Sequence, residues 1–239
     1  MERRVTPSDQ AEAQRRAAGE AAAARVRDGT VIGYGTGRAA TAALEALAKR
    51  VQGGLRVRGV PTSQRTAELA QRLGLPLVEL SEVNELDLVI DGADEVDPQH
   101  QVLKGGGGAL TREKLVALAA RERVLVLEEA KLVQQLGTLR GLPIELIAFG
   151  WTQTLARIAA VLPGAALRRG ADGAPMPSDN GALLCDAPLP PGADLRALAR
   201  ELKALPGVIE HGLFLDLSPT LIVGGAAGVR VLREAGARA

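Results

Sequence analysis

The fold class is decided by residues 30–40, TVIGYGTGRAA. Residues 30–34 suit a short buried strand, the glycines at positions 35 and 37 end it, and residues 39–50 have a helical composition. The same order recurs along the first half of the chain, with strands expected at 55–60, 77–80, 86–90, 102–104 and 124–127 and helices at 8–27, 63–73 and 110–121. Because apolar strands that alternate with helices form a parallel sheet with helices on both faces, the sequence predicts the α/β class.

Beyond residue 136 the pattern changes, because prolines punctuate the chain and the expected strands become short. The elements expected there are helices at 151–162 and 193–205 and strands at 181–186 and 213–217. We therefore expect a parallel-sheet domain over residues 1–135 and a small α+β domain over residues 136–212. The tail, residues 213–239, is expected to return to the first domain, with residues 221–232 joining its sheet.

The composition excludes several classes of protein. The chain has 239 residues and a formal charge of +1, and it lacks the large basic block that is typical of proteins that bind nucleic acid or a membrane surface. One cysteine, Cys185, and two histidines, His100 and His211, are too few for an intramolecular disulfide or a zinc site with several such ligands. We interpret Cys185 as a buried apolar side chain and His211 as a histidine without a catalytic role.

The first residues are polar and charged, unlike a signal peptide, and no apolar run reaches the roughly 18 residues of a membrane span. We therefore expect a cytoplasmic protein with no membrane or nucleic-acid partner.

Four loops with chemically rich side chains follow predicted strands, at 35–40, 61–66, 91–97 and 104–113. Right-handed crossovers place such loops along one edge of a parallel sheet, where ligands bind. A glycine turn that leads into a helix exposes N–H groups at the positive helix end, which favours phosphate binding over a simple tight turn. Gly35, Gly37 and Ala40 also match a loose dinucleotide pattern, but the next strand ends without an acidic residue for a ribose, and no P-loop string occurs.

Residues 91–97, DGADEVD, place four carboxylates directly after an apolar strand. Crowded carboxylates repel one another, so some must be paired, metal-bound or protonated unless the segment is a solvated acidic turn. Their spacing does not fit a calcium-binding loop. The alternative to the solvated turn is that Asp91 and Asp94 point into a ligand cleft while the other carboxylates face solvent.

Residues 104–114, KGGGGALTREK, combine four glycines with a lysine at a strand end and a glutamate in the first turn of a helix. Consecutive glycines cost backbone entropy on folding and are useful where the backbone approaches a ligand closely. Lys104 suits an oxyanion or a phosphate. Glu113 alone could simply complement the helix dipole, but a shared sheet edge with Lys104, Asp91 and Asp94 favours a role in chemistry.

Together these strings resemble the type A ribose-5-phosphate isomerase family. The matching strings are GTGRA, Pro61-Thr62-Ser63, DGADEVD, KGGGGALTREK, Glu129-Ala130-Lys131, Asp179-Asn180-Gly181, and Pro206-Gly207-Val208 followed by Gly212-Leu213-Phe214. The resemblance implies a Rossmann-like domain with a smaller α+β domain, usually in a homo-oligomer, a dimer or a tetramer. It also implies an enzyme of the pentose phosphate pathway that interconverts D-ribose 5-phosphate and D-ribulose 5-phosphate through an enediolate, with no metal or other cofactor.

The resemblance further implies roles for single residues. Glu113 is the general base, Asp91 and Asp94 assist ring opening and move hydroxyl protons, and Lys104 stabilises the enediolate. The residues implied in binding the sugar phosphate are Thr36, Gly37, Arg38, Ala39, Asp91, Gly92, Ala93, Asp94, Lys104, Gly105, Gly106, Gly107 and Lys131. A base that takes and returns one proton, with a cation beside the developing oxyanion, is what aldose–ketose isomerisation requires.

Arg38 and Ala39 depart from the family pattern, which has two hydroxyl side chains after the GTG glycines. We hypothesise that Arg38 binds the phosphate as a bidentate fork. The alternative is that Arg38 points to solvent while Thr62, Ser63 or Lys131 serves instead. The exchange also leaves room for another aldose phosphate as the substrate.

Three other functions share this class of fold. A sugar-phosphate effector domain of a transcription regulator is disfavoured, because the first strand near residue 30 leaves too little chain for a helix-turn-helix and because such a domain does not need Glu113 with Lys104. A CoA-transferase uses a glutamate covalently and differs in its ping-pong exchange and thioester. A nicotinamide-dependent oxidoreductase is disfavoured by the missing acidic residue after the second strand.

Overall fold

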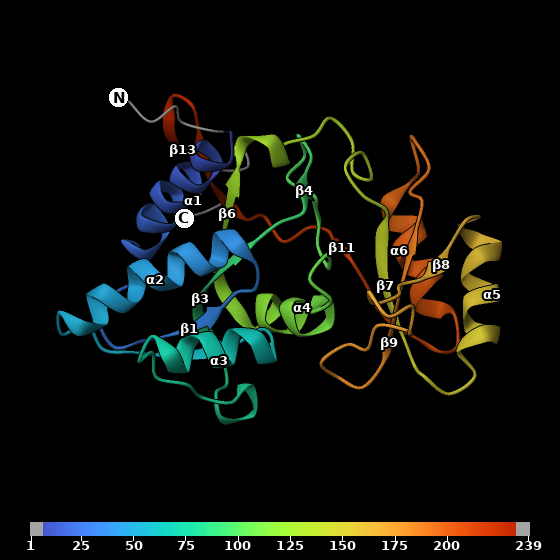
Figure 1. Ribbon diagram of the computed structural model, residues 1–239, viewed down its shortest axis with the longest axis horizontal. Coiled ribbons are helices and arrows are strands. Elements are labelled where there is room, and N and C mark those ends of the chain that lie inside the picture. The colour runs from blue at the N-terminus through green and yellow to red at the C-terminus, as the bar shows by residue number, and fades with distance from the viewer. Residues whose placement is uncertain (1–6, 233–239) are drawn as a thin grey trace. The chain divides into compact units, whose positions relative to one another are not determined.

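The computed structural model describes residues 7–232, which fall into two compact units (Figure 1). Within these residues, unit 1 takes in 7–93, 115–131 and 217–232, and unit 2 takes in 94–114 and 132–216. The outer ends of the expected first domain, residues 1–6 and 233–239, lie outside the described residues.

Unit 1 is built on a six-stranded sheet with the strand order β13-β12-β6-β3-β1-β2. Its strands are β1 (Thr30–Tyr34), β2 (Val57–Pro61), β3 (Leu86–Gly92), β6 (Ala120–Glu128), β12 (Thr220–Gly225) and β13 (Gly228–Leu232). Neighbouring strands are parallel except for β12 with β13, and the pairing of β12 with β6 brings residues 220–232 into this sheet. Tyr34 on β1 is level with Pro61 on β2 and Ile90 on β3, so the loops after these strands leave the same sheet edge.

Helices cover both faces of this sheet, which confirms the predicted α/β class (Figure 1). Three of them share a core on one face: α1 (Pro7–Ala23), α2 (Arg38–Gln52) and α3 (Gln64–Arg72). Ile32 of β1 belongs to that core. The next residue, Gly33, points to the opposite face, where Val116 of α4 (Leu110–Ala119) packs against it.

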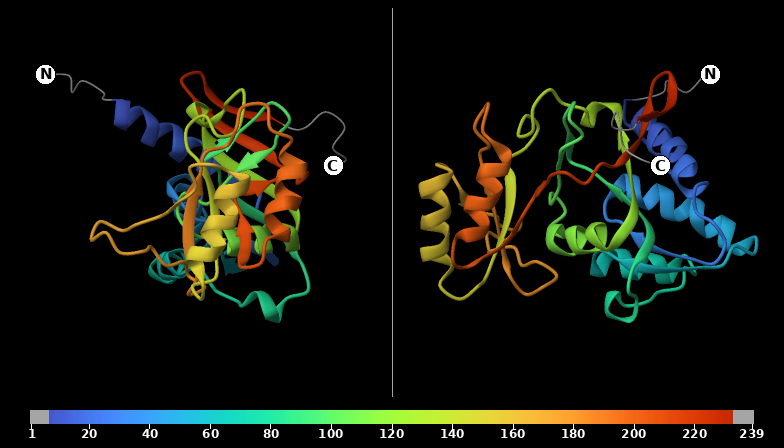
Figure 2. Two further views of the ribbon diagram at one scale, coloured as in Figure 1. Left: turned by 90° about the vertical axis from the view of Figure 1, so that its right-hand side faces the viewer. Right: turned by 180° about the vertical axis from the view of Figure 1, so that it is seen from behind.

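Unit 2 contains two antiparallel sheets. The three-stranded sheet, in the order β11-β5-β4, consists of β4 (Glu95–Val96), β5 (Val102–Leu103) and β11 (Leu213–Phe214). The four-stranded sheet, in the order β10-β7-β9-β8, consists of β7 (Leu142–Leu146), β8 (Ala166–Leu167), β9 (Leu183–Ala187) and β10 (Val208–His211). The helices α5 (Trp151–Val161) and α6 (Leu195–Ala204) lie beside this second sheet (Figure 2). Their fully buried residues Ile158 and Leu202 belong to its core.

One expected strand is wrong, and another joins a different sheet from the one expected. Among the described residues, the segment 77–80 makes a single bridge, from Leu77 to Gly59, and then enters a short 3-10 helix, η1 (Leu80–Glu82). The extended segment at 102–104 contains β5, which belongs to the antiparallel sheet of unit 2 and not to the parallel sheet. Strands of two residues are too short to carry the alternating pattern that would reveal their partners.

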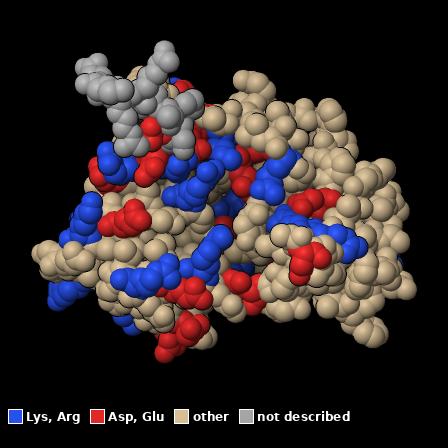
Figure 3. Space-filling view, viewed as in Figure 1, with Lys and Arg blue, Asp and Glu red and all other residues tan. Residues whose placement is uncertain are grey.

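The burial of Cys185 and the mixture of charges on the surface match what the composition predicts. Cys185 on β9 is fully buried, as predicted, and burial raises the pKa of its thiol to about 12. Basic and acidic side chains are interspersed on the face shown in Figure 3. No helix between residues 7 and 232 combines the length and the apolar character needed to cross a membrane.

Candidate active site

The turn between β1 and α2 is shaped for a close approach of backbone segments. A Cβ atom on Gly35 would come within 2.4 Å of Asp91, so a larger residue does not fit there. Gly37 has a φ of 103° and precedes α2, and no side chain of a described residue caps this helix. The first-turn N–H groups of α2, which begins at Arg38, therefore lie at the positive helix end without a side-chain acceptor.

Four hydroxyl side chains gather behind this turn. Thr36 Oγ1 lies 2.7 Å from Thr62 Oγ1 and 3.0 Å from Thr66 Oγ1, and it donates to Ser63 Oγ at 2.8 Å. Ser63 caps α3 as predicted, because its Oγ accepts from the N–H of Thr66. All four side chains are buried, so this cluster joins the first two loops to each other.

Asp91 at the end of β3 is 2% exposed and is oriented by two backbone donors. Its Oδ1 accepts from the N–H of Thr36 at 3.0 Å and from the N–H of Gly92 at 2.7 Å. The N–H of Thr36 therefore donates to Asp91, and its hydroxyl donates to Ser63 within the hydroxyl cluster. Lys131 ends a short 3-10 helix, η2 (Glu129–Lys131), which follows the carboxyl end of β6 in the same unit.

In unit 2, Lys104 and Glu113 form a buried ion pair. Lys104 Nζ lies 3.1 Å from Glu113 Oε1, and the two residues are 4% and 5% exposed. Lys104 follows β5, where its N–H donates to the carbonyl of Gly212, and its Nζ lies 5.8 Å from the centre of the Phe214 ring. Glu113 lies in the first turn of α4, as predicted. Burial strengthens the attraction between the two charges.

The glycine loop at 105–108 is held from two sides. Arg168 donates to the carbonyl of Gly105 at 3.0 Å and to that of Gly106 at 3.3 Å. The N–H of Gly106 donates to Asp94 Oδ2 at 2.7 Å. The structure thus brings Asp94 to the glycine loop, and it adds an arginine for which the sequence carried no motif.

The expectation that the other carboxylates of DGADEVD face solvent is wrong. Glu95 is fully buried, and its carboxylate accepts the N–H groups of all four residues 137–140 at 2.7–3.1 Å. Asp97 is also buried, and its Oδ1 accepts from the N–H groups of Gln99 and Gln101. A carboxylate that accepts several backbone N–H groups satisfies their hydrogen-bonding needs where the chain turns, so these two residues stabilise loops.

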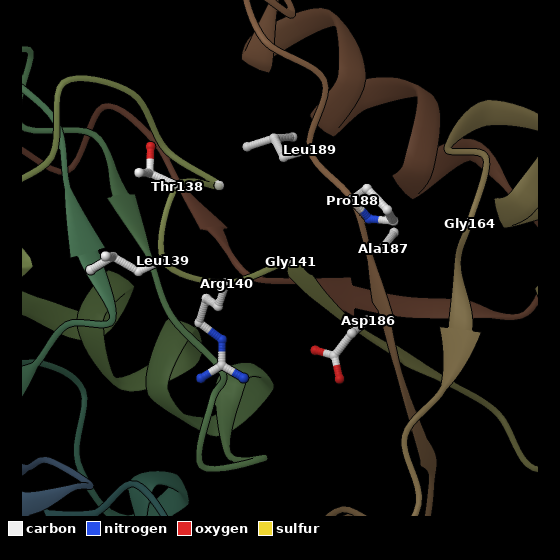
Figure 4. A pocket seen from close by; sticks show the side chains of 10 residues that line it. Thr138, Leu139, Arg140, Gly141, Gly164, Asp186, Ala187, Pro188 and Leu189 are labelled. Atoms are coloured by element: carbon white, nitrogen blue, oxygen red, sulfur yellow. The ribbon is translucent and has the colours of Figure 1, made fainter.

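A cavity of about 490 Å³ opens in unit 2 (Figure 4). Its lining residues are Gly137, Thr138, Leu139, Arg140, Gly141, Gly164, Asp186, Ala187, Pro188 and Leu189. Arg140 Nη1 lies 3.3 Å from Asp94 Oδ1 and would collide with a Cβ atom on Gly106. Figure 4 shows the guanidinium of Arg140 and the carboxylate of Asp186 extending the same way. Arg140 is a further charged neighbour of the glycine loop that no sequence motif indicated.

A second, partly buried charge cluster contains Lys114, the residue after Glu113. Lys114 Nζ donates to Glu210 Oε1 and to the carbonyl of His211, both at 2.7 Å. Burial lowers the pKa of Lys114, although the charge of Glu210 partly offsets this. Burial alone would raise the pKa of Glu210, but the charge and hydrogen bond of Lys114 outweigh it and lower that pKa to about 2.

His211 belongs to the same cluster. Burial, followed by the charge of Lys114, lowers the pKa of the His211 imidazole to about 4. A buried histidine that is neutral near pH 7 and contacts Lys114 suits a structural role, which is what the sequence suggested for it.

Each unit holds part of the predicted residue set. Unit 1 carries Thr36, Gly37, Arg38, Ala39, Asp91, Gly92, Ala93 and Lys131, and unit 2 carries Asp94, Lys104, Gly105, Gly106, Gly107 and Glu113. Within residues 7–232, no group of three or more His, Cys, Asp or Glu side chains is placed to hold a metal ion.

Known proteins match the chain in sequence. A family model described as ribose 5-phosphate isomerase A (phosphoriboisomerase A) matches residues 58–228. The ribose-5-phosphate isomerase A of Synechococcus sp. (strain JA-3-3Ab) is 46% identical over 222 residues, which cover 92% of this chain and 96% of the relative. That of Agrobacterium fabrum (strain C58 / ATCC 33970) is 46% identical over 222 residues, which cover 90% and 95% of the two chains.

Solved structures match it in fold. Ribose 5-phosphate isomerase A from Methanocaldococcus jannaschii has a TM-score of 0.88 and 34% identity, and the match covers 93% of this chain and 99% of that one. A D-ribose-5-phosphate isomerase in complex with phospho-erythronic acid has a TM-score of 0.89 and 34% identity over the same shares. The similarity therefore extends over segments of both units.

Proposed function

The chain belongs to the ribose 5-phosphate isomerase A family and is a ribose-5-phosphate isomerase by class, and we propose that it works through an enediolate with Glu113 as the general base. The buried pair of Lys104 and Glu113, 3.1 Å apart, carries the proposal. Moving one hydrogen between adjacent carbons needs a carboxylate that takes up a proton and returns it. It also needs a cation beside the oxygen that gains charge. The pair supplies both groups.

In the proposed reaction, the Glu113 carboxylate removes the proton from C2 of the open-chain aldose. The electron pair of that bond forms a double bond between C1 and C2, and the C1 carbonyl oxygen becomes an oxyanion that the Lys104 ammonium stabilises. A proton then moves from the O2 hydroxyl to O1, and Glu113 returns its proton to C1 as the C2 carbonyl forms. Asp91 and Asp94 are proposed to move hydroxyl protons here and in ring opening. The sugar gains and loses no electrons overall.

We propose that the turn into α2 binds the phosphate of the substrate. An uncapped helix N-terminus suits an anion, and the exposed Arg38 can add a bidentate contact. Thr36 uses its donors within unit 1, so its proposed contribution is to orient Asp91. The other residues proposed to hold the substrate are Gly37, Ala39, Gly92, Ala93, Asp94, Lys104, Gly105, Gly106, Gly107 and Lys131.

The test is conversion of ribose 5-phosphate to the ketose with a chelator present. We expect Glu113→Gln to lose activity by about 10²–10⁴-fold, because an amide cannot accept the C2 proton. Glu201→Gln, the same exchange at an exposed position of α6, is the control and should stay active. Full turnover by Glu113→Gln would place the base elsewhere, with Asp91 and Asp94 next to be tested.

The homo-oligomer, a dimer or a tetramer, is also a proposal. β13 lies at the edge of the sheet of unit 1, and its apolar Val229 and Val231 are exposed. An exposed edge strand with apolar side chains favours pairing with another chain. Light scattering measures the mass in solution, and a mass near the 24.8 kDa of one chain would contradict the proposal.

A further inference from the structure

Glu145 is a fully buried carboxylate that the proposed reaction does not use. It lies on β7, and the three side chains that donate to it within residues 7–232 are neutral. The hydroxyl of Thr111 donates to its Oε2, the hydroxyl of Ser178 donates to its Oε1 at 2.5 Å, and Asn180 Nδ2 donates to Oε1 at 3.0 Å. A buried carboxylate is costly unless its oxygens are well bonded, so this arrangement implies a specific role.

Asn180 connects this carboxylate to a second residue of α4. Its Oδ1 accepts from Arg112 Nε at 2.8 Å while its Nδ2 donates to Glu145. Arg112 also donates to the carbonyl of Asp179 at 2.8 Å. The Asp179-Asn180-Gly181 string, to which the reaction assigns no role, thus contacts the helix that carries the proposed base.

The contacts reach the two residues directly before Glu113. Thr111 and Arg112 lie in the first turn of α4, where N–H groups have no partner within the helix and the end tends to fray. Fixing both side chains to β7 and to the 178–180 turn holds that first turn in place. Glu113 follows at once and meets Lys104 at 3.1 Å.

We infer that Glu145, Ser178 and Asn180 form a clamp on the first turn of α4, and that this clamp positions Glu113 for proton transfer. The inference rests on the proposed role of Glu113. Glu145 and Asn180 are positioning residues, since they act through another side chain. Their effect should appear in kcat, because displacing a catalytic group by about 1 Å can cost about 10²-fold in rate.

Thr111 offers a matched set of variants. Thr111→Val keeps the shape of the side chain but removes the hydroxyl that donates to Glu145, whereas Thr111→Ser keeps the hydroxyl. We expect Thr111→Val to lower kcat about 10- to 100-fold with KM within about threefold, and Thr111→Ser to restore most of the rate. Thr152→Val is the control, because Thr152 is the exposed second residue of α5 as Thr111 is the second residue of α4.

A combined variant tests whether the clamp acts through Glu113. In a Glu113→Gln background, assayed at high enzyme concentration, Thr111→Val should cause little further loss, because the group it positions is already disabled. An equal loss in both backgrounds would overturn the inference, and so would a Thr111→Val enzyme that melts earlier but keeps its kcat. Full activity of Glu113→Gln alone would instead refute the proposed base.

Asn180 provides a second route if Thr111→Val does not fold. Its side chain is exposed, so Asn180→Ala opens no cavity in the core, and Asn84→Ala is the equivalent change at an exposed site of unit 1. We expect the same fall in kcat for Asn180→Ala and none for Asn84→Ala. Unchanged kcat in Asn180→Ala would overturn the role of the amide.

Discussion

Replacing Lys104 by methionine should destabilise the protein, and adding Glu113→Gln should restore most of that stability. The two charged groups are 3.1 Å apart and almost completely buried. Methionine keeps much of the length of lysine but leaves the carboxylate of Glu113 without its cation. Breaking a buried pair from one side costs about 3–5 kcal/mol of unfolding free energy, whereas removing both members leaves neither of these two charges buried without the other.

Activity should respond differently. The loss of one group that stabilises an oxyanion lowers kcat by about 10²–10³-fold, so Lys104→Met and the double variant should both be nearly inactive. Urea unfolding measures the stabilities, and Lys49→Met, at an exposed position of α2, is the control. The reasoning is refuted if Lys104→Met loses less than about 1 kcal/mol, or if the double variant is the less stable of the two.

Three further results are expected. The free energy of unfolding should fall by up to about 3 kcal/mol as the pH drops from about 6.5 to about 4. The reason is that the pKa of His211 is lowered to about 4 in the folded protein, so in this range only the unfolded chain takes up the proton. His211→Gln should reduce this pH dependence, as measured by urea unfolding at pH 7 and pH 5. Gly59→Ala should lower the melting temperature and cost about 1–3 kcal/mol, because the new methyl group would lie 1.9 Å from the Tyr34 ring; an unchanged melting temperature would contradict this packing. Arg38→Ala should raise KM about tenfold and Arg38→Lys should raise it less, since only arginine can form a fork to phosphate; an unchanged KM would place the phosphate on other groups.

The sequence could predict those parts of the site that depend on neighbours in the chain. The glycine turn after β1, the Ser63 cap of α3 and the place of Glu113 in the first turn of α4 all follow from local patterns. A strand, a turn and a helix start are each set by a few consecutive residues, and these are the features that residue type and spacing reveal.

The parts that the sequence could not predict depend on partners far along the chain. Glu95 accepts N–H groups from residues more than 40 positions away, so nothing next to it marks it as buried. β5 pairs with β11 across more than 100 residues, and each of these strands has two residues. Pairings this short and this distant carry no periodic signal, because the hydrogen-bond partners are chosen by tertiary packing.

The same limit explains the segment at 94–114. No change in composition marks it, yet it packs with residues 132–216 in unit 2, because β4 and β5 continue into a sheet with β11. The chain therefore enters unit 2 between Asp91 and Asp94, inside a string that reads as one motif. Residues that are adjacent in one sequence motif can therefore belong to different units of the structure.

Because the predicted site residues are divided between the two units, we expect substitutions in unit 1 and in unit 2 to affect different kinetic constants. Arg38 and Ala39, where the chain departs from the pattern it resembles, lie in unit 1. In unit 2, Lys104 contacts Glu113, and Thr111 of α4 contacts Glu145 of the clamp. Substitutions in the turn before α2 are therefore expected to affect the proposed phosphate binding more than the proposed proton transfer. Arg38 variants should accordingly change KM and spare kcat, while clamp variants should do the reverse. If Arg38→Ala lowered kcat as far as Thr111→Val, the proposed separation of binding from proton transfer would be wrong.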